Sequence, residues 1–178
     1  MWAYGPVTLR PIEQRDMKML RDLLNDPDIV SSVVDYGFPV SAAAQEEWFA
    51  KVSPGENAYR FMVEADGETV GSILFSKVDQ ENKTGTLGYK IVREFQGHNY
   101  AYYAVCAITD FLFDKKGIEC IIVNHLHTNA GSRRIMEKAG FLFEGTARSA
   151  VYKNGQRNDL VCWSCSREHY KKIRKDVV

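Results

Sequence analysis

Apolar residues recur at helical spacing in several parts of the chain, and the first of these lies near the N-terminus. The apolar residues there are Met17, Leu20, Leu23 and Leu24. Residues three and four positions apart share one face of a helix, so this pattern predicts an amphipathic helix over 13–26. Ser41 is suited to be the N-cap of another helix, over 42–52.

The longest helical pattern begins near Asn99. Its apolar stripe consists of Ala101, Ala104, Val105, Ile108, Phe111 and Leu112. Gly117 suits the end of this helix, because glycine readily adopts the left-handed conformation found there. A shorter helix is predicted over 129–140, with Asn129 as its N-cap and Gly140 as its stop. The polar tail is also expected to be helical.

Alternating and β-branched runs predict strands between these helices. The predicted strands cover 7–12, two segments within 59–78, then 85–92, 118–126, 141–152 and 159–166. Asp66-Gly67 is a hairpin turn signal, and 153–158 reads as a second turn. We find no repeat or linker, so we expect one domain over 1–178. Because helices lie among the strands, it should be an α/β or α+β domain with a mixed sheet.

The composition is that of a soluble globular protein, with 45% hydrophobic and 26% charged residues among 178. Lys+Arg and Asp+Glu both total 23, so the formal net charge is zero. Nucleic acid and anionic membranes are therefore not expected as partners. No apolar run approaches the ~20 residues of a membrane helix, and the N-terminus does not resemble a signal peptide. These features favour a cytoplasmic protein.

Four cysteines occur in segments predicted to be helix or strand: Cys106, Cys120, Cys162 and Cys165. Cys162 and Cys165 form a C-x-x-C sequence on a predicted strand. Side chains three residues apart on a strand point to opposite faces, so the two sulfurs should not meet. We therefore expect reduced structural cysteines rather than a redox or zinc site.

A short polar turn links the strand that ends near Val92 to the helix that starts near Asn99. Gly97 has no Cβ to block a ligand, and asparagine is the residue other than glycine that best tolerates positive φ. The free N–H groups of a helix N-terminus favour an anion, so the turn is a candidate phosphate site. The glycine patterns of dinucleotide-binding and P-loop proteins are missing, and a tight connection without a ligand is the alternative.

This turn and its surroundings resemble a known family. The segment "GYKIVREFQGHNYAYYAV", 88–105, looks like the acetyl-CoA motif of the GNAT N-acetyltransferase superfamily, with its pyrophosphate loop [QR]-x-x-G-x-[GA]. Segments 7–20 and 129–145 resemble the opening strand and helix and the N-x-x-S element of that family. Segment 154–164 resembles the closing strands of its ribosomal-protein-alanine and polyamine acetyltransferase branch. The resemblance implies a single mixed, mostly antiparallel sheet flanked by helices and splayed between the fourth and fifth strands.

The resemblance also implies an acyl-CoA-dependent N-acetyltransferase that uses acetyl-CoA as co-substrate and no metal. A backbone amide near Tyr89 or Ile91 would hold the thioester oxygen, and Asn129 would reach the pantetheine arm. A helix cap without a ligand is the alternative for Asn129. The implied cofactor-binding residues are Ile91, Gln96, Gly97, His98, Asn99, Tyr100, Ala101, Asn129 and Ser132.

Two positions depart from the family pattern. Asn99 stands where the family usually has glycine, and Met136 replaces a tyrosine that commonly serves as the general acid. Ser132 is the nearest hydroxyl within the motif, and Tyr89 or Tyr152 could share the task. Ser132 and Tyr89 are therefore the candidate catalytic residues, with a serine that only satisfies the helix backbone as the alternative.

The general base stays open at this point. His125 and His127 are two positions apart on a predicted strand and so share a face. They are candidates for a base or for half of a metal site, although two histidines packed under a helix are the commonest arrangement. Glu94, beside the loop, is expected to be a solvated charge rather than a base, and a relay of waters to solvent would also suffice.

The segment over 25–56 should shape the acceptor site, by analogy with the family. Its acidic residues would attract a cationic amine if they form a rim, and solvated helix faces are the alternative. These residues are Asp26, Asp28, Asp35, Glu46, Glu47 and Glu56, against the single Lys51. Tyr36, Trp48 and Phe49 could form the floor of a pocket or belong to the core.

The predicted acceptor is a primary amine, either a protein N-terminus or a small polyamine-like molecule, that attacks acetyl-CoA directly in a ternary complex. A non-catalytic acyl-CoA-binding regulatory module is the competing hypothesis, because Met136 cannot donate a proton. Neither a membrane nor a nucleic acid is an expected partner, and a homodimer is left open.

Overall fold

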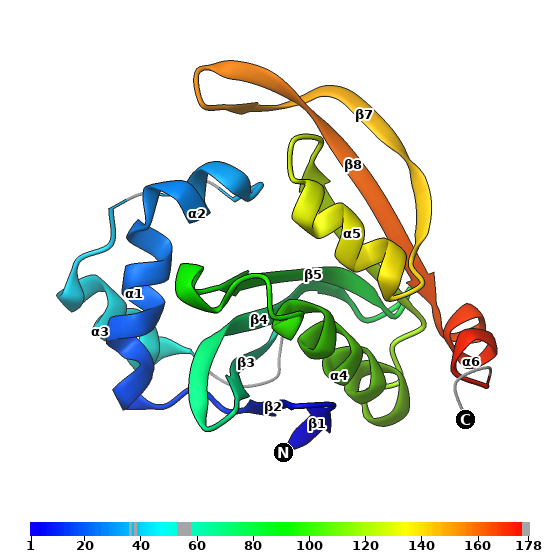
Figure 1. The fold of residues 1–178 in the computed structure, drawn as a ribbon, viewed down its shortest axis with the longest axis horizontal. Helices are drawn as coiled ribbons and strands as arrows, with labels where there is room; N and C mark the ends of the chain where they lie inside the picture. The colour runs from blue at the N-terminus through cyan, green and yellow to red at the C-terminus, as the bar shows by residue number, and fades with distance from the viewer. Residues whose placement is uncertain (36, 38, 53–57, 176–178) are drawn as a thin grey trace.

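A computed structural model describes residues 1–35, 37, 39–52 and 58–175, which form one eight-stranded sheet flanked by helices (Figure 1). In sheet order the strands are β1 (Trp2–Tyr4), β2 (Val7–Arg10), β3 (Ala58–Ala65), β4 (Glu68–Asp79), β5 (Thr84–Ile91), β6 (Cys120–Leu126), β8 (Gln156–Ser166) and β7 (Leu142–Lys153). Only β5 and β6 pair in parallel; the other neighbours are antiparallel.

Six α-helices accompany the sheet in the described part of the chain. They are α1 (Met17–Asn25), α2 (Pro27–Ser32), α3 (Ala42–Lys51), α4 (Tyr100–Lys115), α5 (Ala130–Lys138) and α6 (Arg167–Lys175). Short 3-10 helices, Gln14–Asp16 and Arg93–Phe95, precede α1 and α4. Ser41 caps α3 as predicted, because its Oγ accepts the N–H of Ala44 at 3.1 Å.

Three features of the secondary structure differ from those predicted: one strand, one helix and one turn. The strand β1 was not predicted, because three residues are too few to show an alternating pattern. The single helix predicted over 13–26 is a 3-10 turn followed by α1 and then, after Asp26, by α2. The turn predicted over 153–158 is shorter, since β7 ends at Lys153 and β8 begins at Gln156.

The helix α4 connects the parallel strands β5 and β6 and packs over one face of the sheet. Its residues from Ala104 to Phe113, apart from Asp110, are buried, so it forms the centre of the main core. Trp2 of β1 packs on Phe111 of this helix, with ring centroids 4.9 Å apart. This contact explains how so short a strand is held.

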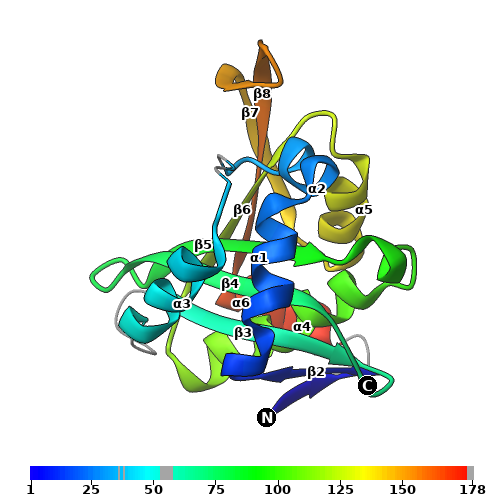
Figure 2. The ribbon, with the colours of Figure 1, turned by 90° about the vertical axis from the view of Figure 1, so that its left-hand side faces the viewer.

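The helices α1 and α3 lie against the opposite face of the sheet, and Figure 2 shows them in front of β3 and β4. Met17 and Leu20 of α1 form a second buried cluster with Met62 of β3. At the start of α1, Arg10 and Asp16 form a buried ion pair, with Nη1 and Oδ2 2.6 Å apart. Two layers of helix therefore sandwich the sheet.

The sheet opens between β5 and β6. Pairing runs from Thr84 with Cys120 to Leu87 with Val123 and then stops, while β6 continues to pair with β8 as far as Leu126. The predicted splay is therefore confirmed. The splay was predicted between the fourth and fifth strands. These are the fifth and sixth strands of the structure, β5 and β6, because the unpredicted β1 comes first.

All four cysteines are free thiols, and the Cys162–Cys165 pair lies along β8. Burial raises the pKa of the Cys165 thiol to about 12, so this sulfur is protonated and inert at neutral pH. No helix within the described ranges is long and apolar enough to cross a membrane.

Candidate active site

The gap between β5 and β6 exposes backbone groups of β5. The N–H of Val92 bonds the carbonyl of Val70 at 2.9 Å, on the β4 side. Alternate residues of an antiparallel strand direct their N–H and C=O groups to opposite sides. Tyr89 and Ile91 therefore direct theirs away from β4 and into the gap, where an extended molecule could add to the strand edge.

The loop that follows β5 presents a cluster of N–H groups. Gly97 has φ 85° and Asn99 has φ 63°, so both adopt the left-handed conformation, which was predicted for Asn99. Within the described residues, the N–H groups from Gly97 through Tyr102 have no hydrogen-bond partner, and the first bond of α4 runs from the Tyr103 N–H to the Asn99 carbonyl. Because such groups and the helix dipole attract negative charge, the loop can bind a phosphate.

The space in front of Gly97 is open, because a Cβ added there would have no atom of a described residue within 4 Å. The N–H of Gln96 is already bonded to the Arg93 carbonyl, and Gln96 Nε2 donates to the Ile91 carbonyl at 3.0 Å. Gln96 therefore ties the loop to the end of β5.

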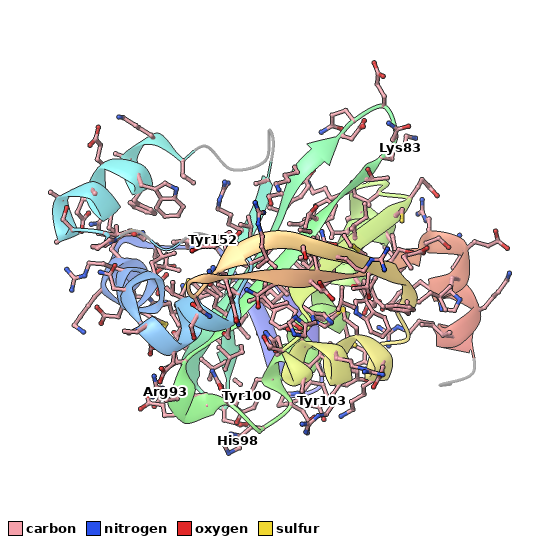
Figure 3. The ribbon with its side chains drawn as sticks, turned by 90° about the horizontal axis from the view of Figure 1, so that it is seen from above. Lys83, Arg93, His98, Tyr100, Tyr103 and Tyr152 are labelled. Atoms are coloured by element: carbon pink, nitrogen blue, oxygen red, sulfur yellow. The ribbon has the colours of Figure 1, made fainter. Side chains whose placement is uncertain are left out.

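Side chains around the loop add positive charge and rigidity. Lys138 Nζ of α5 donates to Asn99 Oδ1 at 3.1 Å, and the His98 ring stacks on Tyr100 with centroids 5.5 Å apart. Tyr100 in turn donates its hydroxyl proton to Asp66 at 2.6 Å. Figure 3 shows Arg93, His98 and Tyr100 together along one edge of the molecule.

The two candidate catalytic hydroxyls meet beside the gap. Tyr89 of β5 donates its hydroxyl proton to Ser132 Oγ of α5 across 3.2 Å. Burial raises the pKa of Tyr89 to about 12, although the bond to Ser132 opposes the shift. The phenol is therefore protonated at neutral pH, and its hydrogen bond leaves the Ser132 proton free to be donated elsewhere.

Asn129 acts as the cap of α5. Its Oδ1 accepts the Ser132 N–H at 2.9 Å, and its Nδ2 donates to the Ser32 carbonyl at 3.0 Å. The structure thus shows the helix cap that was the alternative for Asn129. Both the Oδ1 and the Nδ2 of the Asn129 side chain are hydrogen-bonded. Met136, where the family has a tyrosine, is fully buried in the main core.

A cavity of about 410 Å³ lies between the sheet and helices α1 to α3. Leu20 and Trp48 line it from the helices, and Leu74 lines it from β4. At its other end it reaches Tyr89 and Ser132 beside the gap. The cavity therefore leads from the surface to the hydroxyl pair, as an acceptor site beside a thioester would require.

The model of the acetyltransferase (GNAT) domain matches residues 7–142. The chain belongs to the GNAT acetyltransferase family. The predicted family, fold and class of enzyme, an N-acetyltransferase, are therefore confirmed.

Similar proteins cover nearly the whole of this GNAT chain. A putative ribosomal N-acetyltransferase of Bacillus subtilis (strain 168) is 29% identical over 164 residues, which cover 89% of this chain and 90% of that protein. A spermidine N(1)-acetyltransferase of Escherichia coli (strain K12) is 26% identical over 158 residues, covering 87% and 83%. The crystal structure of spermidine N-acetyltransferase from Vibrio cholerae in complex with CoA and spermine superposes with a TM-score of 0.87 at 22% identity, covering 93% and 98%.

The structure argues against His125 as the base of this GNAT protein. Trp163 Nε1 donates to His125 Nε2 at 2.9 Å, so Nδ1 carries the ring proton and faces the Leu126 carbonyl at 2.7 Å. Both nitrogens are thus occupied in a buried ring. His127 is exposed, and no group of three or more metal-ligating side chains occurs within the described ranges.

The acidic segment does not form a free anionic rim. Arg93 pairs with Asp26 at 3.1 Å and also with Asp28, and Lys90 pairs with Asp35 at 3.4 Å. Gln14 donates to Glu46, and Lys51 pairs with Glu47 at 2.5 Å. Glu56 lies outside the described residues. The alternative, charged side chains on outer faces, describes these residues better.

The aromatic candidates divide between cavity and core. Trp48 lines the cavity as predicted and also packs beside the Met17–Leu20–Met62 cluster, whereas Phe49 only packs beside that cluster. Tyr36 lies outside the described residues. Sequence reasoning missed Gln45, Arg60 and Asn124, which line the cavity from α3, β3 and β6. Their spacing carries no signal, because the cavity exists only where three separate elements meet.

Proposed function

We propose that this GNAT protein transfers an acetyl group from acetyl-CoA to a primary amine, such as a protein N-terminus or a small amine. The observation that carries the proposal is the gap between β5 and β6, which has a cluster of free N–H groups at one end and the Tyr89–Ser132 hydroxyl pair at its side. The loop N–H groups suit the pyrophosphate of CoA, and the Tyr89 and Ile91 backbone suits the pantetheine arm and thioester oxygen.

In the proposed reaction the neutral amine attacks the thioester carbon, so the C–N bond forms while the carbonyl electron pair moves to oxygen. A backbone N–H of β5 stabilises that oxygen. As the carbonyl re-forms, the C–S bond breaks and Ser132 donates a proton to the leaving thiolate. The Ser132 oxygen takes up the Tyr89 proton in turn, and water returns a proton to Tyr89. The extra proton on nitrogen leaves through water, since Asp35 is the only carboxylate among the described residues that line the cavity and it is paired with Lys90.

The competing function is an acyl-CoA-binding module without catalysis, and Met136 favours it because methionine cannot donate a proton. The hydroxyl pair favours catalysis, because a binding module has no need of a proton donor beside the gap. Thiol release from acetyl-CoA with a panel of amines separates the two. We expect amine-dependent release from the parent protein; CoA binding by calorimetry without any release would assign the binding module.

Loop variants test the cofactor site in the same assays. Gly97→Val should lower the affinity for CoA at least about 10-fold, because a β-branched residue at φ 85° is strained and occupies the phosphate space. Asn99→Gly should keep the affinity within about 2-fold, since glycine adopts φ 63° readily, whereas Asn99→Val should lose it. Equal CoA affinity in all three variants would refute this loop as the phosphate site.

A further inference from the structure

The charges that line the acceptor cavity are mostly positive. Among the described lining residues Arg60, Lys77 and Lys90 are cationic, and only Asp35 is acidic. Asp35 already pairs with Lys90 at 3.4 Å, so no described residue of the lining offers an unpaired carboxylate to an ammonium group. The cavity therefore has an excess of positive charge, which disfavours a polycation and favours an anion.

Arg60 lies in line with the gap. Across the sheet Arg60 of β3 faces Leu74 of β4, and Leu74 faces Gly88 of β5. Directly opposed residues present their side chains on the same face of the sheet, and two strand spacings separate the ends of this row by roughly 10 Å. Gly88 has no side chain, and a Cβ added there would have no atom within 4 Å. The row is therefore open at Gly88, and the Leu74 side chain lies between Gly88 and Arg60.

Two carboxamides in the cavity lack the partners that buried amides normally have. Asn124 Oδ1 is buried without a hydrogen-bond partner in the part of the chain that the structure describes, and Asn124 comes directly after Val123, the last residue of β6 paired with β5. Gln45 is 3% exposed, and its one hydrogen bond to described residues is a 3.8 Å contact with the Met17 sulfur. Buried polar groups of this kind are usually satisfied by a ligand or water.

We infer that the acceptor is a primary amine that also carries a carboxylate or phosphate group roughly 10 Å away. Its amine lies in the gap near Gly88, where Asn124 Oδ1 accepts an N–H. Its apolar middle crosses Leu74 and Trp48, and its anionic end binds the Arg60 guanidinium. This inference rests on the proposed acetyl transfer and narrows its acceptor, since it excludes a simple polyamine as the preferred substrate.

A matched series of amines tests the inference. Hexylamine, 6-aminohexanoate and 1,6-diaminohexane have the same carbon chain and differ only in carrying no charge, a negative charge or a positive charge at the far end. A fourth arm, 6-aminohexyl phosphate, distinguishes a phosphate from a carboxylate. We expect kcat/KM for thiol release to be highest with one of the two anionic amines and at least 10-fold lower with the diamine.

Arg60→Gln should abolish this preference. We expect its kcat/KM for the anionic amines to fall by roughly 10- to 100-fold, the usual effect of losing a charged hydrogen bond, while hexylamine changes less than about 2-fold. Arg60→Lys should keep part of the preference. Lys83→Gln is the matched control, because Lys83 lies in the β4–β5 turn and is not among the residues that line the cavity.

The four amines are also titrated into the CoA-bound protein by calorimetry, so that recognition is judged without turnover. If no thiol is released but the anionic amines bind most tightly in the parent and not in Arg60→Gln, the proposed acetyl transfer fails and the inferred recognition stands. Preferred turnover or binding of the diamine would overturn the inference. So would an unchanged preference in an Arg60→Gln protein whose melting temperature shows that it is folded.

Discussion

At the residue scale, the proton donor that we propose is a pair of hydroxyls rather than one side chain. Tyr89 donates to Ser132 Oγ across 3.2 Å, and burial keeps the phenol protonated, with a pKa of about 12. Raising the pKa of an acid extends its neutral form to higher pH. Tyr89 can therefore support Ser132 throughout the neutral and mildly alkaline range.

Ser132→Ala should lower kcat by roughly 10²-fold at saturating acetyl-CoA, because positioned proton donors contribute about 10²–10⁴-fold. Tyr89→Phe should have a smaller effect, since it leaves the Ser132 hydroxyl in place. The parent should lose no activity through Tyr89 between pH 7 and 10, as its pKa of about 12 lies above this range. Steady-state thiol release, paired with thermal unfolding, measures these effects. An unchanged kcat with a lowered melting temperature would assign Ser132 to helix stability alone.

At the element scale, the start of α1 depends on a buried ion pair that holds β2 against the helix. Arg10 donates to both carboxylate oxygens of Asp16, at 2.6 and 2.8 Å, and to Glu64 at 2.5 Å. Burial alone would raise the pKa of Asp16, but the hydrogen bonds from Arg10 and from the Glu13 N–H outweigh it, and the pKa lies below 3.8. The pair therefore links stability to pH.

Arg10→Met should destabilise the protein by about 3–5 kcal/mol, because it leaves a buried carboxylate without its partner. In the parent, stability due to Asp16 is complete above its unfolded pKa of 3.8 and is lost as pH falls through the lower folded value. In the variant, burial is the largest of the remaining effects on Asp16 and opposes the Glu13 N–H bond, so stability should instead rise as pH falls from 7 to 4. Urea unfolding across pH 3–7 measures both slopes.

Lys18→Met is the control for that experiment. Lys18 pairs with Asp22 at 2.6 Å on the same helix, but the Lys18 side chain is 80% exposed. Exposed pairs contribute about 1 kcal/mol or less, so this variant should keep the parent's dependence on pH. Parallel pH slopes for Arg10→Met and the parent would contradict the assignment of Asp16.

At the scale of the whole molecule, the β7–β8 hairpin is hydrogen-bonded to the segment over 31–35, which borders the cavity. In Figure 1 the hairpin arches past α5 with its tip toward α2. Lys153 Nζ donates to the Asp35 carbonyl, and Asn154 Nδ2 donates to the Ser31 carbonyl at 3.1 Å. Asn129 adds a third bond from α5, to the Ser32 carbonyl. The segment beside the cavity thus contacts residues more than 90 positions away in the sequence.

Asn154→Gly should raise the KM for the amine about 5-fold and leave CoA affinity unchanged. Asn154 has φ 53°, which glycine adopts without strain, so the substitution removes only a hydrogen bond worth about 1 kcal/mol. Asn82→Gly, in the β4–β5 turn, is the control. An equal loss of CoA affinity in Asn154→Gly would show a general loosening of the fold rather than a local effect on the segment over 31–35.

The sequence by itself determined what depends on near neighbours. Helical spacing, caps and turn residues specified most elements, and Asn99 has the positive φ predicted because that preference is local. Resemblance over 88–105 identified the family and the splayed sheet. The missed β1 is too short to carry a pattern of its own.

Only the tertiary structure decided which side chains are available for chemistry. His125 loses its free nitrogen to Trp163, 38 residues away, and Asp26 and Asp28 are neutralised by Arg93. Arg60 enters the cavity because α1 and α3 leave space above its face of the sheet. Charge pairing and cavity shape depend on distances between segments that are remote in the sequence. Local sequence patterns do not specify those distances, because they are set by the complete fold.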